Sequence, residues 1–397
     1  MQEKNKKIFG LEKNIFVLGL TSFFNDFSNE IILSSFPAFF TSVLKSGAAS
    51  LGLVEGIADG VSNILKIYSG RLSDKLAKRR LFIFLGYGLS VAVRPFYIFV
   101  SSVSGVLGLR MLDRVGKGVR EAPRDVIISV SSPQNELGRS FGYHRTMDTI
   151  GGILGPLVAY VILTKWPNNW NLLFMTAFFL GIASFVTIFF VKEVFTAKNP
   201  EGGKIFSLNN FSKSSIGFRY YLIAIFVLSV GSLPSAVLLL KTTSIGLVIA
   251  SVPLFYMLYS LSYSSFSYFA GKTSDRIGIT RVLAYGYLIL IVSYVAIAIS
   301  ASAFSLAVSF IIMGIFSACT DATQRSFIAH TVPEYDRGSA YGLYNASIGF
   351  GSMIAGIAGG YVWQVYGPSV ALFGASIVVV VGLVFFYLSS KTVRRNI

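Results

Sequence analysis

The chain carries the same segment twice, and the two copies lie 200 positions apart without a gap. The first copy holds Pro133, Glu136, Gly138, Phe141, Gly142 and Gly151, and the second holds Pro333, Asp336, Gly338, Tyr341, Gly342 and Gly351. A second echo pairs the segment from Gly70 to Lys75 with the segment from Gly271 to Arg276. A repeat of this length predicts two halves built on one plan. Such halves are typical of membrane transporters, which place the substrate between them.

The composition indicates whether lipid or water surrounds the two halves. Hydrophobic residues make up 53% of the chain and charged residues 13%, and the mean hydropathy is +0.66. A soluble domain carries about 25% charged residues, so we expect lipid rather than water around most of the chain. The net charge of +16 would suggest nucleic acid in a soluble protein. Here the basic residues gather in short connections between apolar segments, so we expect no nucleic-acid partner.

The apolar segments predict an all-α polytopic membrane protein. A helix needs about 20 mainly apolar residues to cross a bilayer, and twelve segments meet this length. We expect two pseudo-symmetric six-helix bundles, at 1–192 and 218–397, joined by a polar linker at 193–217. The predicted spans are 14–43, 50–70, 81–101, 104–130, 137–164 and 170–192 in the first half, and 218–240, 246–270, 281–300, 303–330, 338–365 and 368–390 in the second.

Basic residues in the connections predict the orientation. One side of the membrane receives the clusters around Lys7, Lys78, Lys204, Arg276 and Arg394, whereas the other receives only Lys45, Lys165 and Lys241. Because cytoplasmic loops are enriched in Lys and Arg, both termini are predicted to be cytoplasmic. We expect a multi-pass protein of the plasma membrane that is a monomer within the lipid bilayer.

Three motifs now justify a comparison with a known family. The segment from Gly70 to Arg80 resembles the G-x-L-x-D-r-x-G-r-r signature of the major facilitator superfamily, with Ala77 where Gly is usual. The segment from Arg114 to Gly118 resembles its R-x-x-q-G motif, with Lys117 in place of Gln. The segment from Gly151 to Pro156 resembles the g-x-x-x-G-P motif associated with antiporters. The chain resembles this superfamily over its whole length, and in particular its prokaryotic permeases of the drug or metabolite:proton antiporter type.

The resemblance implies a secondary transporter and assigns two further sets of residues. Each repeated Gly-to-Asp motif is implied to lie in a short cytoplasmic turn and to hold the two halves together when the cytoplasmic side is closed. Asp74 would face the helix start near Gly338, and Asp275 the one near Gly138. The residues of this conformational latch are Gly70, Asp74, Arg79, Gly271 and Asp275. The residues of the packing face and hinge are Gly151, Gly155 and Pro156, since small residues allow close helix approach and proline bends a helix.

Charges within the predicted spans mark the candidate site. A charge at the bilayer centre costs about 2.5–3.5 kcal/mol on insertion scales, so it faces a partner or a cavity. Arg110, Arg114, Lys117, Glu121 and Arg124 follow a 4-3-4-3 spacing, which is one helix face. The second half has few such charges, so we expect the first half to carry ion coupling and the second to supply a wall rich in tyrosine. The candidate ion-coupling and substrate residues are Asp26, Glu30, Glu55, Asp59, Asp113, Arg114, Lys117, Arg145 and Asp148.

Several functions remain open at this point. The first is a proton-coupled exporter of a small molecule, with Asp26, Glu30, Asp59 and Asp148 as proton carriers. The same four carboxylates could instead form a permanent ion-pair network. The second function is an importer or facilitator of a polar or anionic metabolite, drawn by Arg114 and Lys117. The third, a membrane sensor without flux, lacks a soluble output domain in the sequence given. We expect no enzyme, cofactor or metal, because no nucleotide-binding loop or Cys/His cluster is present.

Overall fold

The computed structural model of the chain describes residues 8–76, 78–133, 136–194, 216–332 and 337–395, without the side chains of Arg71, Asp74 and residues 393–395. In these ranges the chain is helical, and no β-strand occurs beyond an isolated bridge between Ile8 and Leu11. Contacts divide the chain into two units, Met1–Ser35 with Ile64–Gly202 and Phe36–Asn63 with Gly203–Ile397. Most of the predicted linker lies outside the described residues, so the domain boundaries at 192 and 218 stay a prediction.

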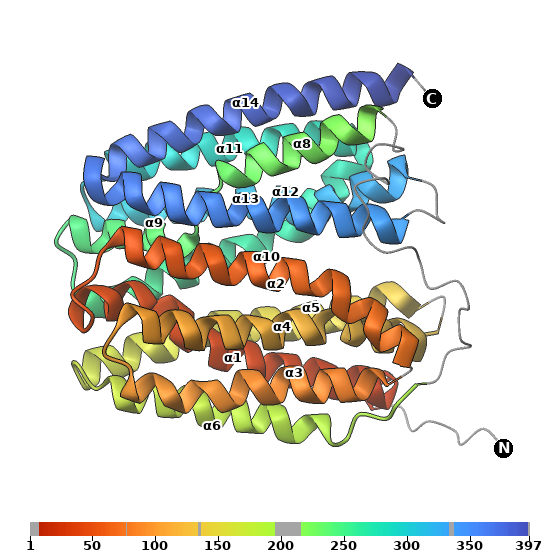
Figure 1. Cartoon of the computed structure of the whole chain (residues 1–397), viewed down its shortest axis with the longest axis horizontal. Helices are drawn as coiled ribbons and strands as arrows, with labels where there is room; N and C mark the ends of the chain where they lie inside the picture. Colours follow the sequence, from red (N-terminus) through yellow and green to blue (C-terminus); the bar gives the residue numbers. More distant parts are fainter. Residues whose placement is uncertain (1–7, 77, 134–135, 195–215, 333–336, 396–397) are drawn as a thin grey trace. The chain divides into compact units, whose positions relative to one another are not determined.

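The first unit is a bundle built around α3 and α4. Its elements are α1 (Lys13–Ser42) as far as Ser35, α2 (Ala48–Leu76) from Ile64, α3 (Arg79–Val93), η1 (Arg94–Phe99), α4 (Val103–Ser131), α5 (Leu137–Lys165) and α6 (Trp170–Ile188). Within this unit α3 lies against α4 and α6 (Figure 1). Apolar side chains from α1, α3, α4 and the end of α6, among them Leu18, Ile83 and Ile127, form its buried core.

The second unit repeats the helical plan. It holds the remainder of α1 and of α2, then α8 (Ile216–Val230), α9 (Ser235–Ser244), η3 (Ile249–Ser251), α10 (Val252–Ile277), α11 (Ile279–Ile299), α12 (Ala303–Thr331), α13 (Arg337–Tyr366) and α14 (Pro368–Arg395). In this unit α8 packs between α13 and α14, and α12 contacts α10 and α11 (Figure 1). Helix α8 is far in the sequence from α13 and α14, so this part of the bundle is a tertiary rather than a local structure.

Helix ends follow from residues that the repeat preserves. Ser102 caps α4 by accepting a hydrogen bond from the Gly105 amide at 3.2 Å, and Ser302 caps α12 by accepting one from the Ser305 amide at 3.2 Å. Serine at this position satisfies an amide that lacks a partner within the helix. A different helix, α10, stops at Gly278, whose φ of 96° is a conformation that favours glycine; this glycine is not preserved in the first half. The two units therefore start equivalent helices with the same chemistry.

Every predicted span overlaps a helix, with two differences in detail. The predicted span 218–240 is divided into α8 and α9 at 231–234, where Pro234 precedes the second helix, because proline cannot donate the hydrogen bond that would continue α8. The segments from Gly70 to Lys75 and from Gly271 to Arg276 lie in the last turns of α2 and α10, and not in the turns predicted for Asp74 and Asp275. Their polar residues are compatible with a helix that extends beyond the apolar stretch.

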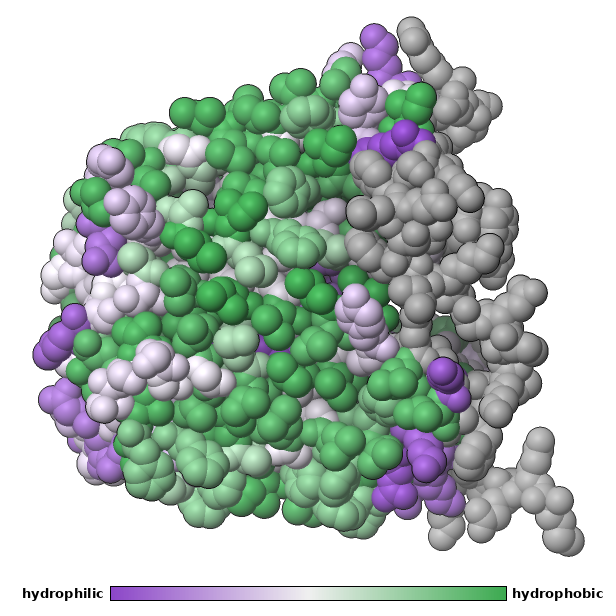
Figure 2. Space-filling model, in the orientation of Figure 1, coloured by the Kyte–Doolittle hydropathy of each residue, from purple (hydrophilic) through white to green (hydrophobic). Residues whose placement is uncertain are grey.

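The surfaces of the helices are those of a membrane protein. Among the described residues, eight helices are long and apolar enough to cross a membrane. The helices α1, α2, α4 and α10 fall outside this group, and each contains charged or polar residues within its length. Large apolar side chains such as Phe179 (65% exposed) and Ile377 (66%) point outward from α6 and α14. On the face shown in Figure 2, hydrophobic side chains cover the middle of the helices and hydrophilic ones gather near their ends.

Candidate functional site

Helix α4 carries a row of charged side chains into the interior of the first unit. Arg110, Asp113, Arg114 and Arg120 are all at least 93% buried. Arg110 donates a hydrogen bond to Asp113 at 3.2 Å, one helical turn away on the same face. A buried charge is stable only when it is paired and hydrogen-bonded, so this row needs acceptors from neighbouring helices. The predicted residues Asp113, Arg114 and Lys117 lie on it.

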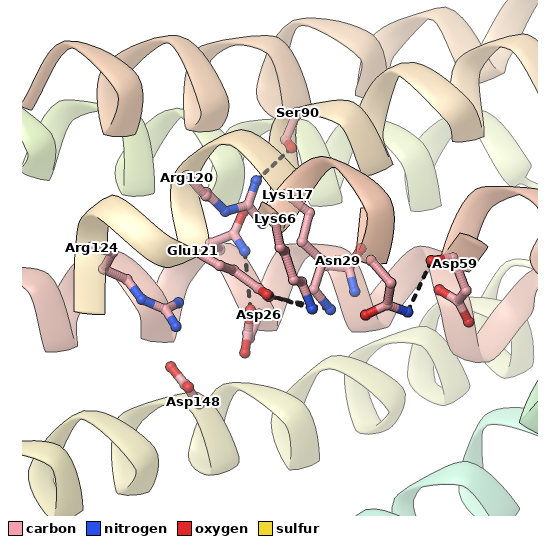
Figure 3. A network of polar contacts seen from close by, with 12 residues as sticks. Asp26, Asn29, Asp59, Lys66, Ser90, Lys117, Arg120, Glu121, Arg124 and Asp148 are labelled. Carbon is pink, nitrogen blue, oxygen red and sulfur yellow. Dashed lines mark hydrogen bonds and ion pairs between the residues drawn. The ribbon is translucent and has the colours of Figure 1, made fainter. Parts of the chain in front are cut away.

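Helix α1 supplies carboxylates to the same interior. Asp26 accepts a hydrogen bond from the Asn25 side chain at 3.0 Å, and Glu30 accepts one from Asn29 at 3.0 Å. Asp26 also interacts electrostatically with Lys117, Arg120 and Arg124 of α4 and with Asp148 of α5. Figure 3 shows the side chains of Asp26, Arg124 and Asp148 pointing toward one another. The structure therefore brings together two of the predicted carboxylates from separate helices.

Helix α5 approaches α1 closely because it presents glycine there. A Cβ atom on Gly151 would lie 2.5 Å from the carbonyl oxygen of Phe23, and one on Gly155 would lie 2.8 Å from that of Phe27. The helix runs on through Pro156 to Lys165. This contact holds the α5 carboxylate Asp148 next to α1. Within α5, the Asp148 Oδ2 atom lies 3.5 Å from Nδ1 of His144.

A bridging carboxylate joins α2 to α4. The two oxygens of Glu121 pair with different lysines, Lys66 of α2 at 2.7 Å and Lys117 of α4 at 3.6 Å. Both lysine side chains remain partly accessible, at 21% and 36%. One turn further along, Arg124 pairs with Asp125 at 3.0 Å. Lys117 was among the predicted site residues, whereas Arg124 had been interpreted as structural or interfacial.

Sequence reasoning missed two buried arginines. Arg94 begins η1 and is 2% exposed. Its guanidinium donates to Oδ1 of Asn25 at 2.8 Å and to Ser28 Oγ at 2.6 Å, and Gly181 of α6 leaves room for it. Arg120 donates to Ser90 Oγ at 2.6 Å and lies over the Tyr87 ring. A charged residue directly before Pro95 was the available signal for Arg94, but no periodicity marks it.

Other predicted residues lie elsewhere. Glu55 and Asp59 belong to the part of α2 assigned to the second unit, where Glu55 is buried and the Asp59 carbonyl accepts from Asn63 at 3.0 Å. Arg145 is exposed on α5. The structure therefore does not gather all nine candidates into one cluster within the first unit.

The latch residues stay a prediction. The side chain of Asp74 lies outside the described part of the structure. Arg79 is buried and donates to the Val194 carbonyl at 3.3 Å, and Gly70 lies against Ala122 of α4. Asp275 is exposed, and a Cβ on Gly271 would have no neighbour within 4 Å.

The second unit holds hydroxyl and amide groups where the first holds charges. Tyr344 donates to the Gln324 side chain at 2.6 Å, and the Gln324 amide donates to Tyr287 at 2.6 Å. Nearer the surface, Tyr263 donates to Asp321 at 2.6 Å. Tyr259 stacks on Tyr263, and the tyrosine-rich wall of a substrate site stays a prediction. Among the described residues, no group of three or more His, Cys, Asp or Glu side chains is arranged to hold a metal ion.

Comparison with known proteins places this geometry in context. The sequence model of the Major Facilitator Superfamily matches residues 18–240 and 220–397. An uncharacterized MFS-type transporter of Methanocaldococcus jannaschii is 31% identical over 402 residues, which is 98% of each chain. A multi-drug resistance efflux pump PmrA homolog of Lactococcus lactis is 22% identical, again over 98% of both. The nucleoside transporter NupG shares the fold at a TM-score of 0.79, with 16% identity over 95% of this chain and 99% of its own.

Proposed function

As a member of the Major Facilitator Superfamily this chain is a membrane transporter, and we propose that it is a proton-coupled exporter of a small molecule. The transporter would cross the plasma membrane twelve times as a monomer, with both termini in the cytoplasm. Its two halves would expose a central substrate site to each side in turn, as in other transporters with internal repeats. The similarity to a multi-drug resistance efflux pump homolog supports export over import.

One observation supports the proposal of proton coupling. Asp26 of α1 and Asp148 of α5 lie together with the cation Arg124 of α4 inside the first unit (Figure 3). Two neighbouring carboxylates repel each other when both are ionised, which favours a state in which one of them holds a proton that it can exchange. Ionisable residues within membrane helices typically mark such proton relays. Binding of a proton and binding of a substrate would then alternate at the same site.

The test begins with a ligand. A thermal-shift screen of the purified protein against metabolites and drugs at two pH values identifies compounds whose binding depends on pH. The flux of such a compound is then measured in proteoliposomes under an imposed pH gradient. Flux that follows the gradient supports the proposal, whereas flux that ignores both the gradient and the membrane potential rejects it.

A second candidate function is import or facilitated movement of a polar or anionic metabolite. The observation in its favour is the partly accessible pair of lysines, Lys66 and Lys117, beside the buried Arg114. The variant Arg114→Gln should then weaken binding of an anionic ligand more than binding of its neutral analogue. Equal weakening of both would assign Arg114 a structural role.

A further inference from the structure

The internal repeat aligns three residues of the first unit with three residues of the second. At an offset of 200 positions, Tyr87 matches Tyr287, Arg124 matches Gln324, and His144 matches Tyr344. Side-chain hydrogen bonds join the three residues of the second unit. These bonds, from Tyr344 to Gln324 and from Gln324 to Tyr287, are both 2.6 Å long. In addition, Tyr221 donates to the Gln324 carbonyl at 2.7 Å.

The matching residues of the first unit are not joined by such hydrogen bonds. Arg124 does not take the place of the Gln324 amide, because its Nε and Nη2 atoms donate to Asp125 at 3.1 and 3.0 Å. The Tyr87 hydroxyl and Nε2 of His144 are buried without a hydrogen-bond partner, and so is Oδ1 of Asp148. Tyr87 is fully buried and His144 is 4% exposed. Buried polar atoms without partners cost free energy and are rare in native structures, so three of them around one arginine call for a functional reason.

His144 and Asp148 offer hydrogen-bond acceptors, and Arg124 has N–H donors that Asp125 does not occupy. The imidazole Nδ1 of His144 faces the Asp148 carboxylate at 3.5 Å. A proton on Nδ1 leaves Nε2 as an acceptor. Oδ1 of Asp148 is an acceptor whenever that carboxyl is ionised. A guanidinium has five N–H donors in a planar fork, of which Asp125 occupies two. Arg124 lies within electrostatic range of Tyr87, Asp148 and His144.

We propose that Arg124 is a two-position switch that moves from Asp125 to Asp148 and His144 when Asp148 loses its proton. This inference rests on the proposed proton coupling and names the group that senses the proton. With Asp148 neutral, the guanidinium stays on Asp125, its hydrogen-bond partner in the structure. With Asp148 ionised, the carboxylate and the free nitrogen of His144 attract the guanidinium away from the more exposed Asp125. The position of an α4 side chain thus depends on a proton held on α5.

The surroundings of Asp148 are consistent with a site that changes its charge. The groups that act on it are Arg124 and Glu121 from α4, His144 and Arg145 from α5, and Asp26 and Ser22 from α1. Asp26 repels the ionised form and the arginines favour it. Arg124 is among the cations that favour the ionised form, so its movement shifts the balance at Asp148.

Infrared difference spectroscopy on the full chain in lipid bilayers, without substrate, tests the switch. The carboxylic C=O band that disappears in Asp148→Asn is followed from pH 5 to 9, which gives the midpoint of Asp148 protonation. Arg124→Gln, which installs the residue of the second unit, should move this midpoint upward by about one pH unit or more, a tenfold gain in proton affinity. Asp125→Asn frees Arg124 for Asp148 and should move the midpoint in the opposite direction.

Two further variants complete the test. Gln324→Leu alters the matched position of the second unit and should leave the midpoint where it is in the wild type. If Arg124→Gln does not fold, the double variant Arg124→Gln/His144→Tyr rebuilds the tyrosine–glutamine–tyrosine set and should show the same upward shift. A midpoint that is unchanged in the Arg124 variants, or that moves in the same direction in Asp125→Asn, overturns the proposal. Since no flux is measured, a failed transport assay would reject proton coupling without affecting this result.

Discussion

The contact between α1 and α5 can be tested by adding one methyl group to Gly155. A Cβ atom at this position would lie 2.7 Å from the Glu30 Cβ, 2.8 Å from the Phe27 oxygen and 3.0 Å from the Ile31 nitrogen. All three distances are shorter than the 3.5–4.0 Å of a favourable contact. Two of the three atoms belong to the α1 backbone, so the clash with the added methyl group can be relieved only if α1 and α5 move apart. Overpacking of this kind costs about 1–3 kcal/mol.

A matched control lies three residues away on the same helix. A Cβ on Gly152 would have no neighbour within 4 Å. Both Gly155→Ala and Gly152→Ala gain the same helix propensity, about 0.5–1 kcal/mol, so the difference between them isolates the cost of overpacking. We expect Gly152→Ala to unfold at or above the wild-type temperature and Gly155→Ala to unfold below it.

Thermal unfolding of the purified variants in one detergent measures this difference. A cost of about 1–3 kcal/mol corresponds to a separation of several degrees, at roughly 2–4 °C per kcal/mol for a bundle of this size. The same separation should appear in the half-life at a fixed temperature if unfolding is irreversible. Equal unfolding temperatures for the two variants would refute the close approach of α5 to α1, and with it the placement of Asp148 beside Asp26.

Three other predictions follow from single contacts. Arg94→Met removes the donor that serves Asn25 and Ser28. It should lower the unfolding temperature, since each buried acceptor left unpaired costs about 1–3 kcal/mol; a wild-type temperature would contradict this. A double-mutant cycle on Lys66→Met and Glu121→Gln should give a coupling energy of about 0.5–3 kcal/mol for their 2.7 Å pair, and additive effects would argue against the pair. Gln324→Leu breaks the bonds to Tyr287 and Tyr344, so it should lower stability without altering the pH dependence of transport. A changed pH profile would place coupling in the second unit.

Much of the helical plan could be predicted from the sequence. The segments 104–130 and 137–164 become α4 (Val103–Ser131) and α5 (Leu137–Lys165), because bilayer length and the polar residues between helices set their limits. The break between α8 and α9 was missed, since the apolar run continues on both sides of Pro234. The turns predicted at Asp74 and Asp275 were wrong because a helix can extend past its apolar stretch.

The site was predictable only in part. Asp26, Lys117 and Asp148 could be chosen because charge is conspicuous in an apolar helix. Their grouping depends on how α1, α4 and α5 pack, which the spacing of residues along one helix does not define. Arg120 does not belong to the 4-3-4-3 spacing of charges on α4, although it is buried beside them. Arg124 lies near the end of α4, which suggested an interfacial role before its proximity to Asp148 was known.

The direct test of proton coupling is the flux of a ligand from the thermal-shift screen into proteoliposomes that contain either the wild type or Asp148→Asn. The pH gradient is imposed across the membrane, and exchange without a gradient is measured in parallel. We predict that the gradient drives accumulation by the wild type, whereas Asp148→Asn retains exchange and loses the response to the gradient. Gradient-driven accumulation of equal size in both proteins would contradict the assignment of Asp148 to coupling.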